Sequence, residues 1–185
     1  RKNFDRYDWT RGQAMNRHNT DNIGADLTAH LQWDGGTTSL GGDYVYNHIF
    51  STNLGEKLSS PRGDYTCADS RHVGNIWLRH TKHWNRVSVS ASAGAAFSPY
   101  GTRALWNASL SYRPARGFDI EAGASQSMRL PTFTDLYYSS PAQVNNLDLV
   151  PEHAITYRLR AAYARGAWSV AASAFYRDGR DIIDW

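Results

Sequence analysis

Apolar and polar residues alternate along most of this chain with a period of two. The clearest stretch is 22–33, where every odd position from Ile23 to Trp33 is apolar and every even position is polar, charged or glycine. Successive side chains of a strand point to opposite faces, so this pattern predicts a strand with one apolar face. The same pattern predicts strands at about 37–50, 72–83, 86–97, 103–113, 118–130, 153–164 and 167–177, and residues 1–9 are a further candidate.

The predicted strands are joined by connections that mostly alternate between short and long. Turn residues lie at 34–36, 84–85, 114–117 and 164–166, longer polar segments at 10–20, 51–71 and 131–152, and an intermediate turn at 98–102. The sequence therefore predicts an all-β fold, an antiparallel meander of about nine long strands. Strands of about ten residues with one apolar face, joined alternately by short turns and long loops, are typical of transmembrane β-barrels.

Alternation alone leaves open whether the apolar face meets lipid or the core of a soluble β-sandwich. Aromatic residues favour lipid, because several lie at or near strand ends on the apolar face, as an interfacial girdle requires. These residues are Trp33, Tyr112, Tyr163, Trp168 and Tyr176. In a sandwich the same side chains would be core aromatics.

Composition excludes several classes of protein. The net charge is +3 with scattered basic residues, which is unlike a nucleic-acid-binding surface, and the single Cys67 excludes an internal disulfide. No apolar run has the length of a transmembrane helix, and no signal peptide opens the chain. Because the chain begins and ends abruptly, we expect a partial domain.

No motif predicts catalysis, a metal or a cofactor. His80 and His83 are three residues apart on a predicted strand, so they point to opposite faces. The acidic run at Asp178, Asp181 and Asp184 lacks the glycine and glutamate spacing of an EF-hand loop. No nucleophile elbow or triad signature is present, so an enzyme is not expected.

Three segments resemble motifs of the TonB-dependent outer-membrane receptors. Residues 128–137, MRLPTFTDLY, are similar to the family's "aromatic-Arg-Ala-Pro-Thr-Phe-x-Glu-Leu-Tyr" segment. Residues 146–152, NLDLVPE, resemble the following "Asn-Pro-x-Leu-x-Pro-Glu" segment, and 174–184 resembles the next strand, which ends in "Asp-x-Ile". The order and spacing agree over the whole of 123–185.

This resemblance implies a receptor of the Gram-negative outer membrane that imports a scarce nutrient with TonB-derived energy. Such receptors have a barrel of about 22 strands with a plugged lumen. The chain 1–185 would then be a partial barrel domain, without the plug domain, the TonB box and the final strands. Implied partners are a siderophore or cobalamin-type ligand, the receptor's own plug domain, TonB and outer-membrane lipid.

Departures from the motifs bear on the ligand. Leu130 replaces the usual small residue before Pro131, and Leu147 replaces the proline after Asn146. Haem importers of this family resemble each other in having a histidine between the two motifs, and residues 132–149 contain none. The missing histidine makes haem a less favoured ligand, and the stretch as a whole most resembles vitamin B12 and ferric siderophore receptors.

Candidate site residues lie around the loop 131–152. Pro131 and Pro151 each restrict the preceding residue to extended geometry, so we expect them to anchor the loop at the barrel rim. Aromatic and amide side chains in the loop are candidate ligand contacts. These residues are Tyr137, Tyr138, Asn145 and Asn146.

Arg129, Arg158 and Arg160 are expected to face the lumen. There we favour ion pairs with acidic groups of the barrel wall over contacts with an anionic ligand or an acidic plug surface. Two other functions compete with the receptor: a passive porin or structural barrel, and a soluble all-β binding module.

Overall fold

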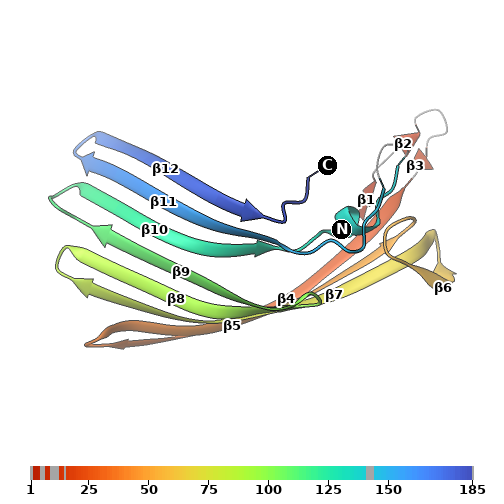
Figure 1. Cartoon of the computed structure of the whole chain (residues 1–185), viewed down its shortest axis with the longest axis horizontal. Helices are drawn as coiled ribbons and strands as arrows, with labels where there is room; N and C mark the ends of the chain where they lie inside the picture. The colour runs from red at the N-terminus through yellow and green to blue at the C-terminus, as the bar shows by residue number, and fades with distance from the viewer. Residues whose placement is uncertain (1, 5–6, 9–12, 15, 141–143, 185) are drawn as a thin grey trace.

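The computed structural model describes residues 2–4, 7–8, 13–14, 16–140 and 144–184. Most of the chain forms one antiparallel sheet in which consecutive long strands are neighbours (Figure 1). Its strands, in order across the sheet, are β1 (Lys2–Phe4), β4 (Arg17–Trp33), β5 (Gly36–Ser51), β7 (Tyr65–Trp84), β8 (Val87–Ser98), β9 (Gly101–Tyr112), β10 (Phe118–Arg129), β11 (Glu152–Arg165) and β12 (Trp168–Arg180). The predicted antiparallel meander of about nine strands is confirmed.

Smaller elements lie outside this order. β6 (Glu56–Arg62) pairs with β7 off the main path, and β2 (Tyr7–Asp8) pairs with β3 (Gln13–Ala14) in a separate two-stranded sheet. One short helix, α1 (Phe133–Tyr137), lies between β10 and β11.

The two ends of the main sheet differ. At one end, which we call the turn end, tight turns join β4 to β5, β7 to β8, β9 to β10 and β11 to β12 (Figure 1). Asn85 and Gly36 adopt the positive φ angles, 45° and 135°, that such hairpin turns need. The opposite end, the loop end, carries β6 and α1 together with the longer connections.

Two polar stretches that were predicted as loops belong in part to strands. β4 already begins at Arg17, inside the predicted loop 10–20, where β3 also lies. Within the predicted loop 51–71, β6 pairs with the first residues of β7, which begins at Tyr65. These extensions have no apolar face, so hydrophobic alternation could not reveal them.

The predicted loop 131–152 contains the helix α1, which the alternation also missed. Thr132 caps it, because its hydroxyl accepts a hydrogen bond from the Asp135 amide at 3.1 Å. The Asp135 carboxylate accepts one from the Thr132 amide at 2.8 Å, which completes a capping box. The local signal was Thr-x-x-Asp, in a segment otherwise too short for helical periodicity to show.

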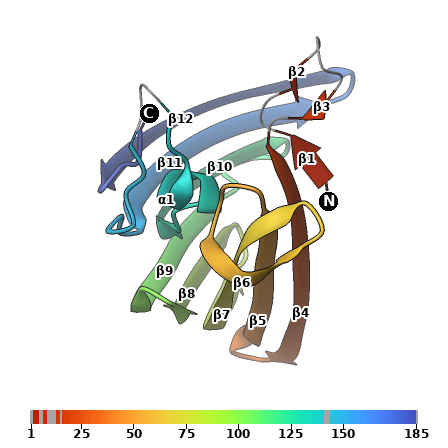
Figure 2. The ribbon, with the colours of Figure 1, turned by 90° about the vertical axis from the view of Figure 1, so that its right-hand side faces the viewer.

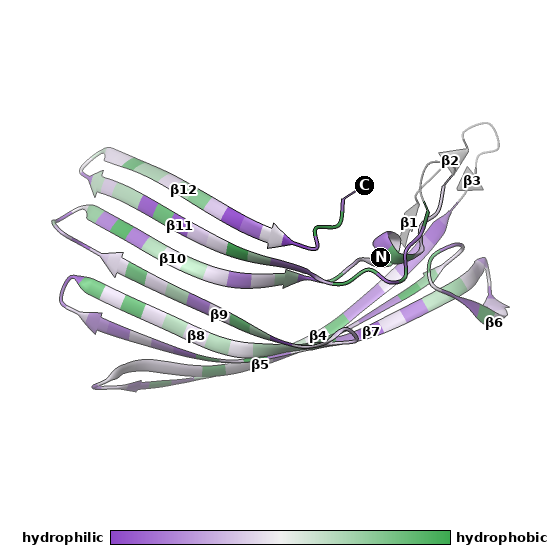
Figure 3. Ribbon diagram, viewed as in Figure 1, coloured by the Kyte–Doolittle hydropathy of each residue, from purple (hydrophilic) through white to green (hydrophobic). Residues whose placement is uncertain are grey.

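One face of the sheet, here called the outward face, is apolar and uncovered. Figure 3 shows the alternation of hydrophobic and polar residues along the strands. Side chains on the outward face such as Leu27 and Ile23 are 80% and 66% exposed. Among the described residues the large aromatic and aliphatic side chains of this face are mostly exposed rather than packed in a core.

The opposite, inward face is polar and carries what core there is. α1 lies in the hollow of the curved sheet (Figure 2). The buried hydrophobic residues of the described chain lie near the loop end: Ile49, Leu54, Cys67, Ala96, Leu136 and Ala154. None of the described helices has the length and apolar character of a membrane-spanning helix.

Candidate functional site

The three predicted lumen arginines share the inward face. In the β10–β11 ladder Arg129 lies opposite Glu152, Gly123 opposite Arg158, and Glu121 opposite Arg160. Paired residues of an antiparallel ladder point to the same side, and the spacing along β10 and β11 keeps all three on one face. The environments of the three side chains nevertheless differ.

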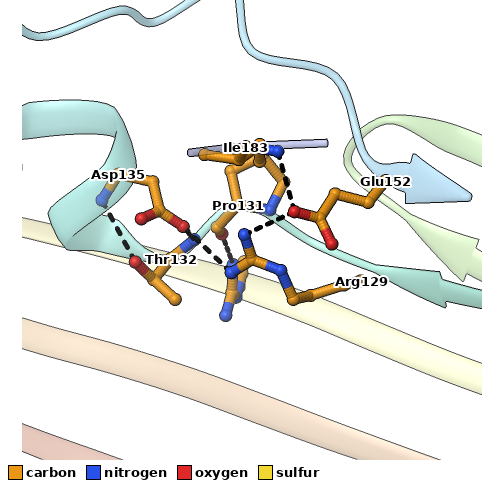
Figure 4. A network of polar contacts seen from close by, with 7 residues as sticks. Arg129, Pro131, Thr132, Asp135, Glu152 and Ile183 are labelled. Atoms are coloured by element: carbon orange, nitrogen blue, oxygen red, sulfur yellow. Dashed lines mark hydrogen bonds and ion pairs between the residues drawn. The ribbon is translucent and has the colours of Figure 1, made fainter. Parts of the chain in front are cut away.

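Arg129 is the centre of an ion-pair network at the loop end (Figure 4). Its guanidinium lies 2.7 Å from Glu152 Oε1 and 3.3 Å from Asp135 Oδ2. The same Glu152 oxygen accepts a hydrogen bond of 2.8 Å from the Ile183 amide, beyond the end of β12. Arg129 thereby connects β10, α1, β11 and the segment after β12.

The network sets the charge of Glu152, which lies at the rim where β11 begins. Hydrogen bonds from Arg129 and from the Ile183 amide lower the pKa of this carboxyl to about 2. Both carboxylates of the network are nearly buried, with side-chain exposures of 9% for Glu152 and 4% for Asp135. Their charges therefore depend on Arg129 for compensation.

A second set of contacts ties α1 to β7, on the far side of the hollow. Arg71 donates to the Pro131 carbonyl at 2.5 Å and to Asn47 Oδ1 at 3.1 Å, and its guanidinium lies 5.0 Å from the Phe133 ring centroid. The Tyr137 hydroxyl donates to Asp69 Oδ2 at 2.8 Å. The contacts of Arg71 with Pro131 and of Tyr137 with Asp69 join residues 60 or more positions apart, so α1 is a strap that bridges the inward face.

Tyr137 has a structural role in the strap, because its hydroxyl is held by Asp69. Burial and the neighbouring Asp69 carboxylate raise the pKa of the Tyr137 phenol well above its usual range. The phenol therefore remains a neutral donor to Asp69. Sequence reasoning selected Tyr137 but missed Asp69 and Arg71, because only the sheet curvature brings β7 near the loop.

The other predicted loop residues lie beyond the strap. Tyr138 is the C-cap of α1, and its amide donates to the Thr134 carbonyl at 3.0 Å. Asn145 and Asn146 are exposed and occupy local turns: the Asn145 amide donates to Ser139 Oγ at 3.1 Å, and Asn146 Oδ1 accepts from the Asp148 amide at 2.9 Å. Three loop residues, 141–143, lie outside the described part of the chain. The ligand role of the loop residues stays a prediction.

Closer to the turn end the inward face forms a polar wall. A hollow of about 230 Å³ is lined by the hydroxyl-bearing residues Ser109, Ser125 and Thr156, together with Glu121 and Arg158. Arg160 lies 3.9 Å from Asp119 and 3.8 Å from Glu121, which is the wall ion pairing that the sequence analysis favoured over a ligand role.

The histidine and aspartate motifs show no metal centre. The His80 ring shares a hydrogen bond of 3.0 Å with Thr38 Oγ1. Within the described ranges no three His, Cys, Asp or Glu side chains are placed to hold a metal ion.

Comparison with known proteins identifies the family. The whole chain, residues 1–185, matches the family described as "TonB dependent receptor-like, beta-barrel". The chain belongs to this family. Its members are outer-membrane proteins of Gram-negative bacteria and are transport receptors rather than enzymes. A comparison with curated proteins gave no match.

Several solved structures of siderophore receptors share this fold. A substituted variant of the ferric enterobactin receptor PfeA from Pseudomonas aeruginosa matches with a TM-score of 0.70 and 12% identity, over 97% of this chain and 30% of that chain. The siderophore receptor PirA from Acinetobacter baumannii matches with a TM-score of 0.69 and 10% identity, over 98% and 31%. PirA from Pseudomonas aeruginosa matches with a TM-score of 0.57 and 12% identity, over 89% and 40%. The chain thus spans well under half the length of these receptors.

Proposed function

We propose that this chain forms part of the barrel wall of a TonB-dependent receptor that imports a ferric siderophore across the outer membrane of a Gram-negative cell. The observation that carries the proposal is the family match over all 185 residues. The curved sheet, with an apolar outward face and a polar inward face, supports a wall between lipid and lumen.

The inward face supports binding of a small polar ligand above a plug. Its loop end carries the charged network of Arg129 and Arg71, and its centre carries the hydroxyl-lined hollow beside Arg158. The Arg158 guanidinium and the hydroxyls of this hollow suit an oxygen-rich, anionic ligand such as an iron chelate, whereas Arg129 is already paired with Asp135 and Glu152. The plug domain and TonB would complete the transport machinery.

Among the two ligand classes left by the sequence, siderophores are the better proposal. The solved relatives include a ferric enterobactin receptor crystallised with enterobactin, which matches with a TM-score of 0.64 and 15% identity. Likeness at this identity concerns the fold, so the ligand assignment depends on experiment. Vitamin B12 is the alternative to be tested beside it.

Within the site, Tyr138, Asn145 and Asn146 are proposed to contact the ligand, since they lie beyond the strap and are at least partly exposed. For Tyr137 we propose an indirect contribution, because its hydroxyl is held by Asp69. Arg129 is proposed to position the loop through Asp135 and Glu152 rather than to bind ligand.

The test uses the intact receptor, expressed in a Gram-negative strain that lacks its own siderophore and cobalamin receptors. Growth under iron limitation is measured with catecholate and hydroxamate ferric siderophores, and cobalamin uptake is measured in parallel. We expect a ferric siderophore to restore growth only when TonB is present. Uptake of cobalamin alone would transfer the proposal to vitamin B12, and uptake of neither would refute nutrient import by this receptor.

A second comparison tests the site residues. Alanine substitution of Tyr138, Asn145 and Asn146 together should weaken siderophore binding to the purified intact receptor, measured by fluorescence quenching. The matched control is Ser139→Ala with Asp148→Ala, which alters partners of the same turns. Unchanged binding in the triple variant would remove these residues from the site without affecting the transport proposal.

A further inference from the structure

The outward face carries, at the loop end, a cluster of aromatic and basic side chains that plays no part in the inward-facing site. We call it the loop-end aromatic cluster. It contains Tyr44, Tyr46, His48 and Phe50 from β5, Arg62 from β6, and Tyr65 and His72 from β7. Alternate residues of β5 place its first four members on the side of Leu40, which is 60% exposed.

Ring contacts connect the cluster across neighbouring strands. The Tyr44 hydroxyl shares a hydrogen bond of 2.5 Å with His72 Nδ1, and the Tyr46 and His72 ring centroids are 5.0 Å apart. Nearer the loops, the His48 and Phe50 rings meet edge to face at 4.3 Å. The rings are thus held in fixed positions although the face is open.

A cationic side chain, Arg62, lies at the Phe50 edge of the cluster. The Arg62 guanidinium stacks 4.7 Å above the Phe50 ring. Among the described residues no carboxylate forms an ion pair with Arg62, whereas its neighbour Asp64 is paired with Arg17. The stacked guanidinium keeps its donors available.

The cluster borders an open groove of about 550 Å³. Its lining includes Ile23, Tyr46, His48, Phe50 and Arg62. Asp21 also lines the groove, opposite His48 in the β4–β5 ladder. The groove therefore offers the Arg62 guanidinium, an imidazole and aromatic edges beside Ile23, together with the Asp21 carboxylate.

We propose that this groove binds the phosphate headgroup of an anionic membrane lipid in the leaflet on the loop side. In a membrane barrel, aromatic belts on the outward face lie at headgroup level. Arginine is suited to phosphate because its donors match phosphate oxygens in pairs. The proposal rests on the family's membrane location and is independent of the nutrient that the receptor imports.

A lipid explains the groove better than a soluble anion because the groove is continuous with the apolar face. Ile23 lines the groove, and Leu27, two repeats of the alternation further along the same face, is 80% exposed. Acyl chains of a lipid whose phosphate meets Arg62 would lie on these residues. A free phosphate would gain nothing from them.

The experiment compares lipid retention by the intact receptor and by its Arg62→Gln variant in nanodiscs of mixed zwitterionic and anionic phospholipid. Native mass spectrometry counts the anionic lipids that stay bound after release from the disc. We expect Arg62→Gln to lower anionic-lipid retention by about fivefold, the effect of one basic residue at a membrane surface. His48→Gln should have a smaller effect in the same direction, and Arg62→Lys should retain most of the binding.

The matched control is Arg165→Gln, which removes an exposed outward arginine at the turn end, beside Trp168 in the β11–β12 ladder. It should leave retention unchanged. The proposal is overturned if Arg62→Gln retains as much anionic lipid as the unaltered receptor, or if Arg165→Gln loses as much. Competition by inorganic phosphate alone at equal phosphate concentration would assign the groove to a soluble anion and would also overturn it.

Discussion

The two faces of the sheet are built from the same strands but are stabilised in different ways. The outward face exposes its aliphatic side chains, Leu27 among them at 80%. The inward face holds a capped helix, two networks of charged groups and the buried residues near the loop end. The outward face thus presents an open apolar surface, which the proposed barrel wall would turn toward lipid, whereas the inward face is held by individual contacts.

The largest effect should come from placing a charge on the outward face. Leu27 lies on the outward face of β4, between Trp33 at the turn end and the position that pairs with Tyr46. Leu27→Arg therefore places a charge near the middle of the apolar band. It should lower the unfolding free energy of the intact receptor in lipid vesicles by about 2–4 kcal/mol. Chemical denaturation in vesicles, read by tryptophan fluorescence, measures this. Thr28→Arg, on the neighbouring inward position, is the control and should change stability much less. Equal effects would contradict the assignment of the faces.

A methyl group added at a glycine should lower the unfolding free energy by different amounts at two positions of the sheet, according to how tightly each is packed. Gly94 faces inward between strands, opposite Trp77, and a Cβ there would collide with the Ile76 carbonyl oxygen. Gly94→Ala should therefore cost roughly 1–3 kcal/mol of unfolding free energy. Gly74 is the matched glycine, because a Cβ there would lie at an ordinary 3.6 Å from the Asp43 carbonyl oxygen. The same denaturation assay should find Gly74→Ala near neutral; a neutral Gly94→Ala would show that the inward packing is loose.

Removal of Arg129 tests whether charge holds the strap. Arg129→Met leaves the Asp135 and Glu152 carboxylates without their cation, so the segment 131–137 should open more often. Hydrogen exchange of these amides, followed by mass spectrometry, should rise roughly tenfold, as the loss of charge-assisted hydrogen bonds predicts. Arg158→Met, on the same face but without such an ion pair among the described residues, is the control. Unchanged exchange in Arg129→Met would show that Arg71 alone secures the strap.

The smallest effect concerns the far anchor of the strap. Tyr137→Phe removes the hydrogen bond to Asp69 and keeps the ring, so it should cost about 1 kcal/mol of local stability. The same exchange experiment measures it at the Leu136 and Tyr137 amides. Tyr138→Phe, whose hydroxyl does not hold Asp69, should leave exchange as it is. A larger effect from Tyr138 than from Tyr137 would contradict the anchoring role of the Asp69 contact.

Much of the fold followed from alternation, because a strand beside lipid must keep one face apolar over its whole membrane depth. That rule failed at the loop end, where β4 begins at Arg17 and β7 at Tyr65, since the residues there carry no apolar face. It also missed α1, whose five residues are fewer than helical periodicity needs. Its capping residues Thr132 and Asp135 were the available signal.

The sequence alone determined the meander, the two faces and, through the motifs at 128–137 and 146–152, the family resemblance that the whole-chain match confirmed. Only the tertiary structure showed that the loop after Pro131 is a strap, because its partners Arg71 and Asp69 lie 60 or more residues away on β7. The same holds for the loop-end aromatic cluster, where the pairing of β6 with β7 brings Arg62 over the Phe50 ring. Alternation fixes which side a residue faces, but the curvature of the sheet decides which distant side chains it meets there.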